Sequence, residues 1–92
     1  MIKSFKHKGL EKFYLTDSVK YIIPEHASKI RRILTQLNDS KTINDMNATS
    51  YKLHQLKGNL KEHWSVMVNG NYRITFIFKN GDAYILDYQD YH

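Results

Sequence analysis

Asn-Gly pairs divide the second half of the chain into short alternating runs, and this pattern constrains the fold more than any other feature. Apolar and polar residues alternate, as in strands that bury one face, in the runs Tyr51 to Leu56, His63 to Val68, Tyr72 to Phe78 and Ala83 to Tyr88. The breaks between the runs are Lys57-Gly58-Asn59, Asn69-Gly70-Asn71 and Asn80-Gly81. Asn-Gly supplies the positive φ that tight hairpin turns require. The second half therefore predicts an antiparallel meander.

The first half has helical spacing instead. Ile2 to Phe5 is predicted as a short strand, and Leu10, Phe13 and Tyr14 have the spacing of a short helix. The clearest helix runs from Glu25 to Asn38, just after Pro24, a residue that suits a first helical turn. Its apolar stripe consists of Ala27, Ile30, Ile33, Leu34 and Leu37. Thr42 to Asp45 has the form of a capping box that would start one more turn.

These elements predict an α+β fold class, with residues 1–92 as one domain whose N-terminal helices pack on one face of the antiparallel sheet. In the third run, Tyr72, Ile74 and Phe76 should face the helices, which leaves Arg73 on the open side of the sheet. A guanidinium in a run otherwise built for burial needs an anionic ligand or a salt bridge, for which Asp87 and Asp90 are the candidates.

Charge and cysteine content narrow the function classes. The chain has no cysteine, which excludes disulfides, thiolate nucleophiles and cysteine-based zinc sites. Its charged start leads into no apolar run, so we expect neither a signal peptide nor a membrane span, and a cytoplasmic protein. Residues 1–61 hold twelve Lys and Arg against five Asp and Glu, which indicates a polyanionic partner, either nucleic acid or an acidic protein. The candidates for that contact are Arg31, Arg32, Lys52, Lys57 and Lys61.

Imidazoles and permanent cations could meet on the open face of the predicted sheet. His54 and Lys57 flank the end of the first run, Arg73 is in the third run, and His92 closes the chain. Such a set suits cleavage of an RNA phosphodiester in which the substrate's own 2′-hydroxyl is the nucleophile. Histidine titrates near neutrality and can serve as base or acid. We expect no metal and no other cofactor.

Several stretches resemble the HigB-type toxins of the RelE/ParE superfamily: residues 56–59, 64–69 and 72–76, and above all the closing Asp90-Tyr91-His92. The likeness spans almost the whole chain and implies a RelE-like microbial ribonuclease fold. It also implies a ribosome-dependent endoribonuclease that enters the A site, contacts 16S rRNA and cuts mRNA codons. The implied partner is a HigA-type helix-turn-helix antitoxin, through which alone operator DNA would be reached.

The resemblance also implies which residues form the site: His54, Lys57, Arg73, Asp90, Tyr91 and His92. His92 would be the base at the 2′-hydroxyl, His54 or Lys57 would help to protonate the leaving group, and the base and acid labels can be reversed. Arg73 with Lys57 would hold the phosphate, Tyr91 would stack on a nucleotide, and Asp90 would orient an imidazole or read a base edge. The chain departs from the family where Met67 replaces a frequent arginine and where Leu60 replaces a frequent basic residue.

Two rival interpretations keep part of this picture. A ParE-like protein would be a non-catalytic inhibitor of DNA gyrase, and a plain nucleic-acid-binding or co-repressor module would use only its lysines. His54 and His92 favour the nuclease, because neither rival has a use for acid–base groups. The remaining histidines, His7, His26 and His63, are predicted to be surface or turn residues.

Overall fold

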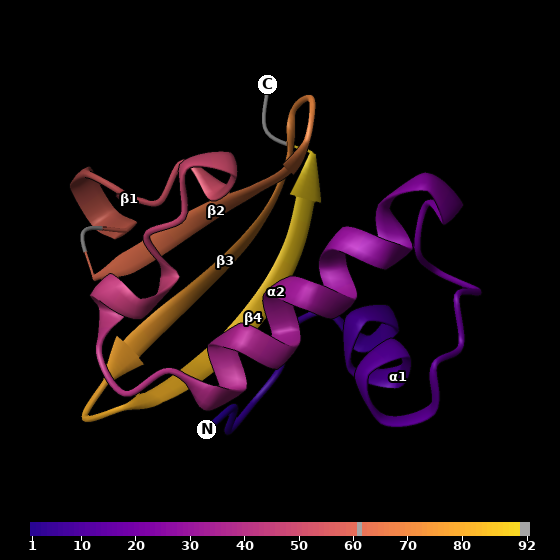
Figure 1. Cartoon of the computed structure of the whole chain (residues 1–92), viewed down its shortest axis with the longest axis horizontal. Coiled ribbons are helices and arrows are strands. Elements are labelled where there is room, and N and C mark those ends of the chain that lie inside the picture. The colour runs from indigo at the N-terminus through magenta and orange to yellow at the C-terminus, as the bar shows by residue number, and fades with distance from the viewer. Residues whose placement is uncertain (61, 91–92) are drawn as a thin grey trace.

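The computed structural model describes residues 1–60 and 62–90 and has the predicted α+β architecture, with helices packed on a four-stranded antiparallel sheet (Figure 1). The helices are α1 (Lys8–Thr16) and α2 (Ala27–Asp39), and the strands are β1 (His54–Gln55), β2 (His63–Asn69), β3 (Tyr72–Lys79) and β4 (Asp82–Asp90). Short 3-10 turns cover Pro24–His26, Ile43–Met46, Thr49–Tyr51 and Gly58–Leu60. The strand order β1-β2-β3-β4 follows the chain, which confirms the meander.

The Asn-Gly turn between β3 and β4 behaves as predicted. Asn80 and Gly81 have φ values of 53° and 81°. A hairpin turn with positive φ at both central residues matches the right-handed twist of the strands that it joins. The sequence signal at this turn therefore specifies the longest pairing of the sheet, between β3 and β4.

The first predicted strand is much shorter than the alternation suggested. Residues 51–56 were expected to be extended, but only His54–Gln55 pairs with β2. Tyr51 belongs instead to a 3-10 turn, because its ring is buried and its hydroxyl donates to Gln36 Oε1 at 3.0 Å. Lys52 then takes the left-handed conformation with a φ of 47°, which interrupts the strand.

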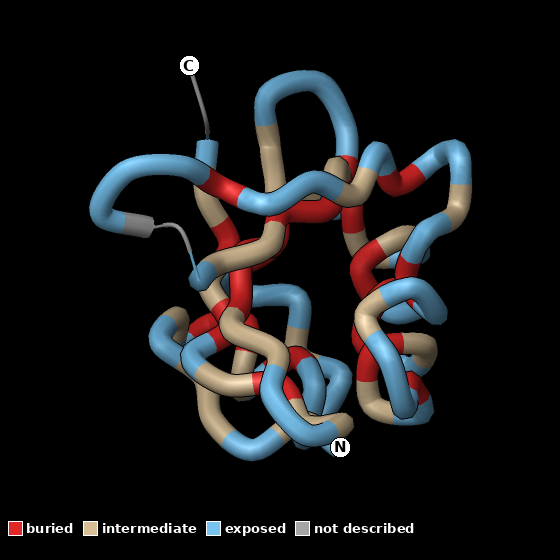
Figure 2. The backbone as a smooth tube through the Cα atoms, turned by 90° about the vertical axis from the view of Figure 1, so that its left-hand side faces the viewer, coloured by how far each residue is buried: buried red, intermediate tan, exposed pale blue. Residues whose placement is uncertain are grey.

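The apolar stripe of α2 forms the centre of the core. Ile30, Ile33 and Leu37 are completely buried, and they belong to the same hydrophobic cluster as Ile74 and Phe76 of β3. Buried stretches lie where the helices meet the sheet, and most turns are exposed (Figure 2). Within the described ranges, no helix has the length and apolar character needed to cross a membrane.

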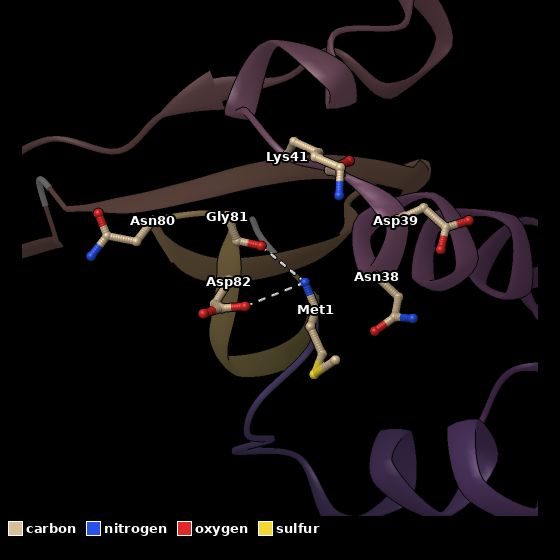
Figure 3. A pocket seen from close by; sticks show the side chains of 8 residues that line it. Met1, Asn38, Asp39, Lys41, Asn80, Gly81 and Asp82 are labelled. Carbon is tan, nitrogen blue, oxygen red and sulfur yellow. Dashed lines mark hydrogen bonds and ion pairs between the residues drawn. The ribbon is translucent and has the colours of Figure 1, made fainter.

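The start of the chain is attached to the edge of the sheet. Ile2 and Phe5 form parallel bridge pairs with Ala83 and Leu86 of β4, so the predicted first strand is present only as isolated pairs. The terminal ammonium of Met1 donates to the Gly81 carbonyl at 2.9 Å and lies 3.5 Å from Asp82 Oδ1 (Figure 3). The cavity of about 530 Å³ at this point lies at the β3–β4 turn, whereas Arg73 lies at the other end of β3.

The predicted capping box forms at Thr42 and Asp45. Asp45 Oδ2 accepts hydrogen bonds from the backbone N–H groups of Lys41 and Thr42, at 2.9 and 3.1 Å. These two bonds lower the pKa of the Asp45 carboxyl below its usual range. Because the folded pKa is lower than the unfolded pKa, the carboxylate stabilises the fold above about pH 4, and this contribution is lost as the pH falls through the folded value.

We therefore expect Asp45→Asn to be less stable than the wild type at neutral pH and to approach it in acid, where the protonated carboxyl resembles an amide. Urea unfolding of both proteins across a pH series measures the difference in the free energy of unfolding. A difference that stays constant as the pH falls below about 4 would contradict the role assigned to the carboxylate.

Candidate active site

The register of the sheet places a set of mostly polar residues on the face opposite the helices. A cross-strand row of His54, Ser65, Thr75 and Asp87 spans all four strands, and Met67, Arg73 and Gln89 form the next row. Directly opposed residues project to the same side of a sheet, and residues two apart on a strand share that side. We call this side the polar face, which carries His54, His63, Ser65, Met67, Arg73, Thr75, Asp87 and Gln89.

The polar face is recessed, so the expectation of an open side is wrong in part. Ser65 and Thr75 are 0% and 3% exposed, and Arg73 is half-buried. A cavity of about 170 Å³ lies over this floor and is lined by Lys6, Leu56, His63, Thr75, Ile85, Asp87 and Gln89. Leu56, next to β1, and Ile85, in β4, line it from the two edges of the sheet, which explains why the floor is screened from solvent.

Unsatisfied polar atoms are concentrated on this face. Within residues 1–60 and 62–90, the buried side-chain atoms without a hydrogen-bond partner are His63 Nδ1, Ser65 Oγ and Arg73 Nη1. All three residues belong to the polar face. Each such atom costs about 1–3 kcal/mol, and native structures keep few of them without a functional reason. The clustering therefore indicates a place that receives a polar ligand.

Arg73 forms no ion pair with Asp87, one of the two candidate carboxylates. Asp87 Oδ2 lies 4.0 Å from Lys6 Nζ, and Asp87 Oδ1 accepts a hydrogen bond from the Tyr88 backbone N–H at 3.0 Å. The cross-strand neighbours of Arg73 are instead the uncharged Met67 and Gln89. The guanidinium charge is therefore left to attract an anion on the polar face.

His54 is exposed on the short edge strand β1, and its Nδ1 lies 3.2 Å from the Lys52 carbonyl oxygen. With the proton on Nδ1, this contact leaves Nε2 as the proton acceptor. At the strand spacing of about 4.8 Å and two residues of offset, the Cα atoms of His54 and Arg73 are about 12 Å apart. Their side chains can approach one phosphate group from two sides.

Lys57 lies beside this arrangement. It is exposed and lines a cavity of about 490 Å³ together with Gln55, Leu56, Gly58 and Glu62. Leu56 lines both this cavity and the one over the polar face. The structure thus brings Lys57 next to the face that holds His54 and Arg73.

Other predicted site residues lie elsewhere. Asp90 is exposed and opposes Tyr72, so its side chain starts from the face opposite Arg73. Arg31 and Arg32 lie on the exposed side of α2, on the other side of the sheet, and Arg31 is engaged with Asp17 at 3.3 Å. The predicted site residues Lys61, Tyr91 and His92 lie outside the described residues.

The sequence missed His63, Ser65 and Gln89 as members of this face. The same alternation that placed Arg73 would have placed Ser65, but a serine in an apolar run carries no chemical signal of its own. The prediction that His26 is a surface or turn residue is only half right. It lies in the turn before α2 but is buried, with its Nδ1 at 2.6 Å from the Tyr88 hydroxyl.

The architecture is that of a RelE-like toxin. The structure resembles a chain of the YoeB-YefM complex from Staphylococcus aureus, with a TM-score of 0.59 over 97% of this chain and 98% of that chain, at 15% sequence identity. The model of the HigB-like toxins, described as RelE-like toxins of the type II toxin-antitoxin system HigB, matches residues 3–92. Endoribonuclease HigB of Proteus vulgaris is 45% identical over the full length of both chains.

The chain therefore belongs to the HigB-like toxin family. This confirms the resemblance drawn from the sequence, including the RelE-like fold. A toxin of a type II toxin-antitoxin system has an antitoxin as its partner. A ParE-like gyrase inhibitor and a plain binding module are both displaced by this family assignment.

The guanidinium of Arg73, whose Nη1 has no partner among the described residues, should destabilise the folded state. We expect Arg73→Met to raise the free energy of unfolding by about 1 kcal/mol, because it removes a buried N–H without a partner and adds an apolar side chain beside Met67. Urea denaturation measures the change, and Lys79→Met, at the exposed end of the same strand, is the matched control, expected to stay within about 0.5 kcal/mol of the wild type. A clear loss of stability in Arg73→Met would show that the guanidinium supports the fold.

Proposed function

We propose that this toxin is an endoribonuclease that cuts mRNA in the ribosomal A site by attack of a 2′-hydroxyl on the adjacent phosphodiester. The observation that carries the proposal is the buried Nη1 of Arg73, which has no partner among residues 1–60 and 62–90, on the face that also holds His54. Arg73 has no ion pair with Asp87, and a guanidinium with an unsatisfied N–H is suited to the bidentate recognition of a phosphate. The 45% identity to a protein named Endoribonuclease HigB supports the same activity.

The reaction needs one base, one acid and a positive charge. The base removes the proton of the 2′-hydroxyl, and the 2′-oxygen then attacks phosphorus. The bond from phosphorus to the 5′-oxygen breaks as the acid protonates that oxygen, which yields a 2′,3′-cyclic phosphate and a 5′-hydroxyl. Arg73 holds the phosphate and stabilises the charge of the phosphorane.

Imidazoles fill the proton-transfer roles in this proposal. His92 takes the base role, and His54 or Lys57 takes the acid role. The roles of the two histidines can be exchanged, because an imidazole can serve as base or as acid. Lys57, beside the polar face, adds a second cation near the phosphate. Tyr91 stacks on a nucleotide, and Asp90 orients an imidazole or reads a base edge.

The magnitudes favour a substrate that is positioned by the ribosome. Acid–base catalysis contributes about 10²–10⁴-fold and one oriented charge donor about 10²–10³-fold. Holding the reacting groups in line is worth about 7–11 kcal/mol, which a small face with exposed His54 and Lys57 does not supply alone. In this proposal 16S rRNA and mRNA bind Arg31, Arg32, Lys52 and Lys61, a HigA-type helix-turn-helix antitoxin neutralises the toxin, and operator DNA is reached only through the antitoxin.

The role of the 2′-hydroxyl as nucleophile can be tested by removing its oxygen from one nucleotide of the substrate. We expect ribosomes programmed with a synthetic mRNA to yield no cut when a single 2′-deoxynucleotide stands at the scissile position of the A-site codon. The same replacement one codon upstream should leave the rate of cutting unchanged. End mapping on both messages gives the result, and a cut at the deoxy linkage would refute attack by the 2′-hydroxyl.

The role of His54 can be tested by His54→Gln, which keeps a polar side chain but cannot transfer a proton at neutral pH. We expect the rate of mRNA cutting to fall by about 10²–10⁴-fold, since acid–base catalysis is lost at one end of the reaction. Co-sedimentation with ribosomes serves as the control and should not change. A variant that cuts at the wild-type rate would assign the role to Lys57 instead.

A further inference from the structure

Another cavity lies at the edge of β4, where the chain enters α1. Its volume is about 670 Å³, and it is lined by Lys6, His7, Lys8, Gly9, Lys12, Tyr21 and Asp87. We call it the α1 cavity. Three exposed lysines face a single carboxylate there, so the cavity is cationic. Neither the family assignment nor the mechanism above uses these lysines.

An exposed aromatic ring stands at the wall of this cavity. Tyr21 is 56% exposed although it is large and partly apolar, and the Nζ of Lys20 lies 5.4 Å from the centre of its ring. A Cβ placed on Gly9 would lie 2.4 Å from the Cβ of Tyr21, so the loop after α1 is in close contact with the start of the helix. This contact holds the tyrosine beside the lysines instead of letting it pack into the core.

The α1 cavity adjoins the polar face. Arg73 opposes Gln89, and Gln89 Nε2 donates to Thr75 Oγ1 at 3.0 Å. Thr75 in turn opposes Asp87, whose Oδ2 lies 4.0 Å from Lys6 Nζ. Lys6 and Asp87 line both cavities. A ligand held at Arg73 can therefore extend across β4 to Lys8, Lys12 and Tyr21 without leaving a polar surface.

Lysines beside an exposed aromatic ring are suited to bind single-stranded nucleic acid. The lysines contact phosphates, and the aromatic side chain stacks on a base. A carboxylate-rich protein segment would use the lysines equally well. Such a segment would also find a packing surface on the ring, but it would have no reason to follow the polar surface from Arg73. The observations thus favour RNA as the occupant.

We propose that the α1 cavity is a subsite for the single-stranded RNA that runs on from the scissile linkage, with one base stacked on Tyr21 and phosphates on Lys8 and Lys12. The proposal rests on the proposed nuclease function and adds where the substrate goes after the cut site. Lys6, at the boundary of the two cavities and near Asp87, marks the point where the strand crosses the sheet edge.

Binding of a 2′-O-methyl RNA hexamer to the purified protein, followed by fluorescence anisotropy over a NaCl series, tests the charge contacts. We expect the double variant Lys8→Gln and Lys12→Gln to bind more weakly and to reduce the slope of log K against log salt by about 1.4, since each phosphate contact on a single strand contributes about 0.7. Lys41→Gln with Lys79→Gln, exposed lysines that line neither cavity, is the matched control and should leave the slope within error.

The ring is tested by Tyr21→Ala and Tyr21→Phe. Loss of stacking should weaken the binding of the hexamer by about 5- to 100-fold in Tyr21→Ala, whereas Tyr21→Phe keeps a stacking surface and should bind as the wild type does. Thermal unfolding of both variants separates loss of binding from loss of fold. Equal binding by Tyr21→Ala and the wild type overturns the stacking contact.

The occupant and the nuclease function can fail separately. If a hexaglutamate peptide, and not the RNA, loses affinity in the double lysine variant, the cavity takes an acidic segment and the RNA subsite is wrong. Cutting of mRNA on ribosomes is measured in parallel with Arg73→Met. If Arg73→Met loses mRNA cutting while the double lysine variant keeps the wild-type salt slope, the nuclease proposal is supported and the subsite proposal is wrong. If the salt slope changes as expected but the wild type cuts no mRNA, the cavity binds RNA and the nuclease proposal fails.

Discussion

The packing of α2 on the sheet fixes the register on which the other features depend. Ile74 and Phe76 are completely buried on the helix-covered side. Arg73 and Thr75, which alternate with them along β3, must therefore project to the other side. A shift of pairing by one residue would exchange the two faces and bury the guanidinium under α2, a cost of several kcal/mol. The hydrophobic core therefore determines the geometry of the site without contributing a residue to its chemistry.

The polar face shows how the fold accommodates costly groups. His63, Ser65 and Arg73 each keep a buried atom without a partner among the described residues, and a chain of 92 residues has only a small net stability to offset them. These positions are polar although both strands carry apolar runs nearby, Val66-Met67-Val68 in β2 and Phe76-Ile77-Phe78 in β3. Stability alone would favour an apolar residue at each of these three positions. The polarity of the three residues is best explained by a ligand that completes their hydrogen bonds.

The sequence predicted the parts of this structure that depend on local chemistry and periodicity. The α2 stripe, the Asn80-Gly81 turn and the capping box at Thr42 and Asp45 all formed, since each is decided within a few residues. The length of β1 was wrong because the hydrogen bond of Tyr51 to Gln36 comes from another element. The burial of His26 was missed for the same reason, as its partner Tyr88 is 62 residues away. The recessed floor at Arg73 likewise depends on Leu56 and Ile85, which no local pattern connects.

The division of charge on the polar face explains how so small a site can be sufficient. Met67 stands directly opposite Arg73, at a position where the family resemblance implies a frequent arginine, so this chain has one guanidinium in that cross-strand pair. One guanidinium attracts a phosphate less strongly than two would, and the half-buried position of Arg73 partly offsets this because less water screens the charge. Lys6 lines the cavity over the polar face, and Lys57 lines the neighbouring cavity, which shares Leu56 with it. The arrangement places one strong contact at the centre and weaker, solvated ones along the path of the strand, as suits a protein that must grip one linkage of a polymer and then release it.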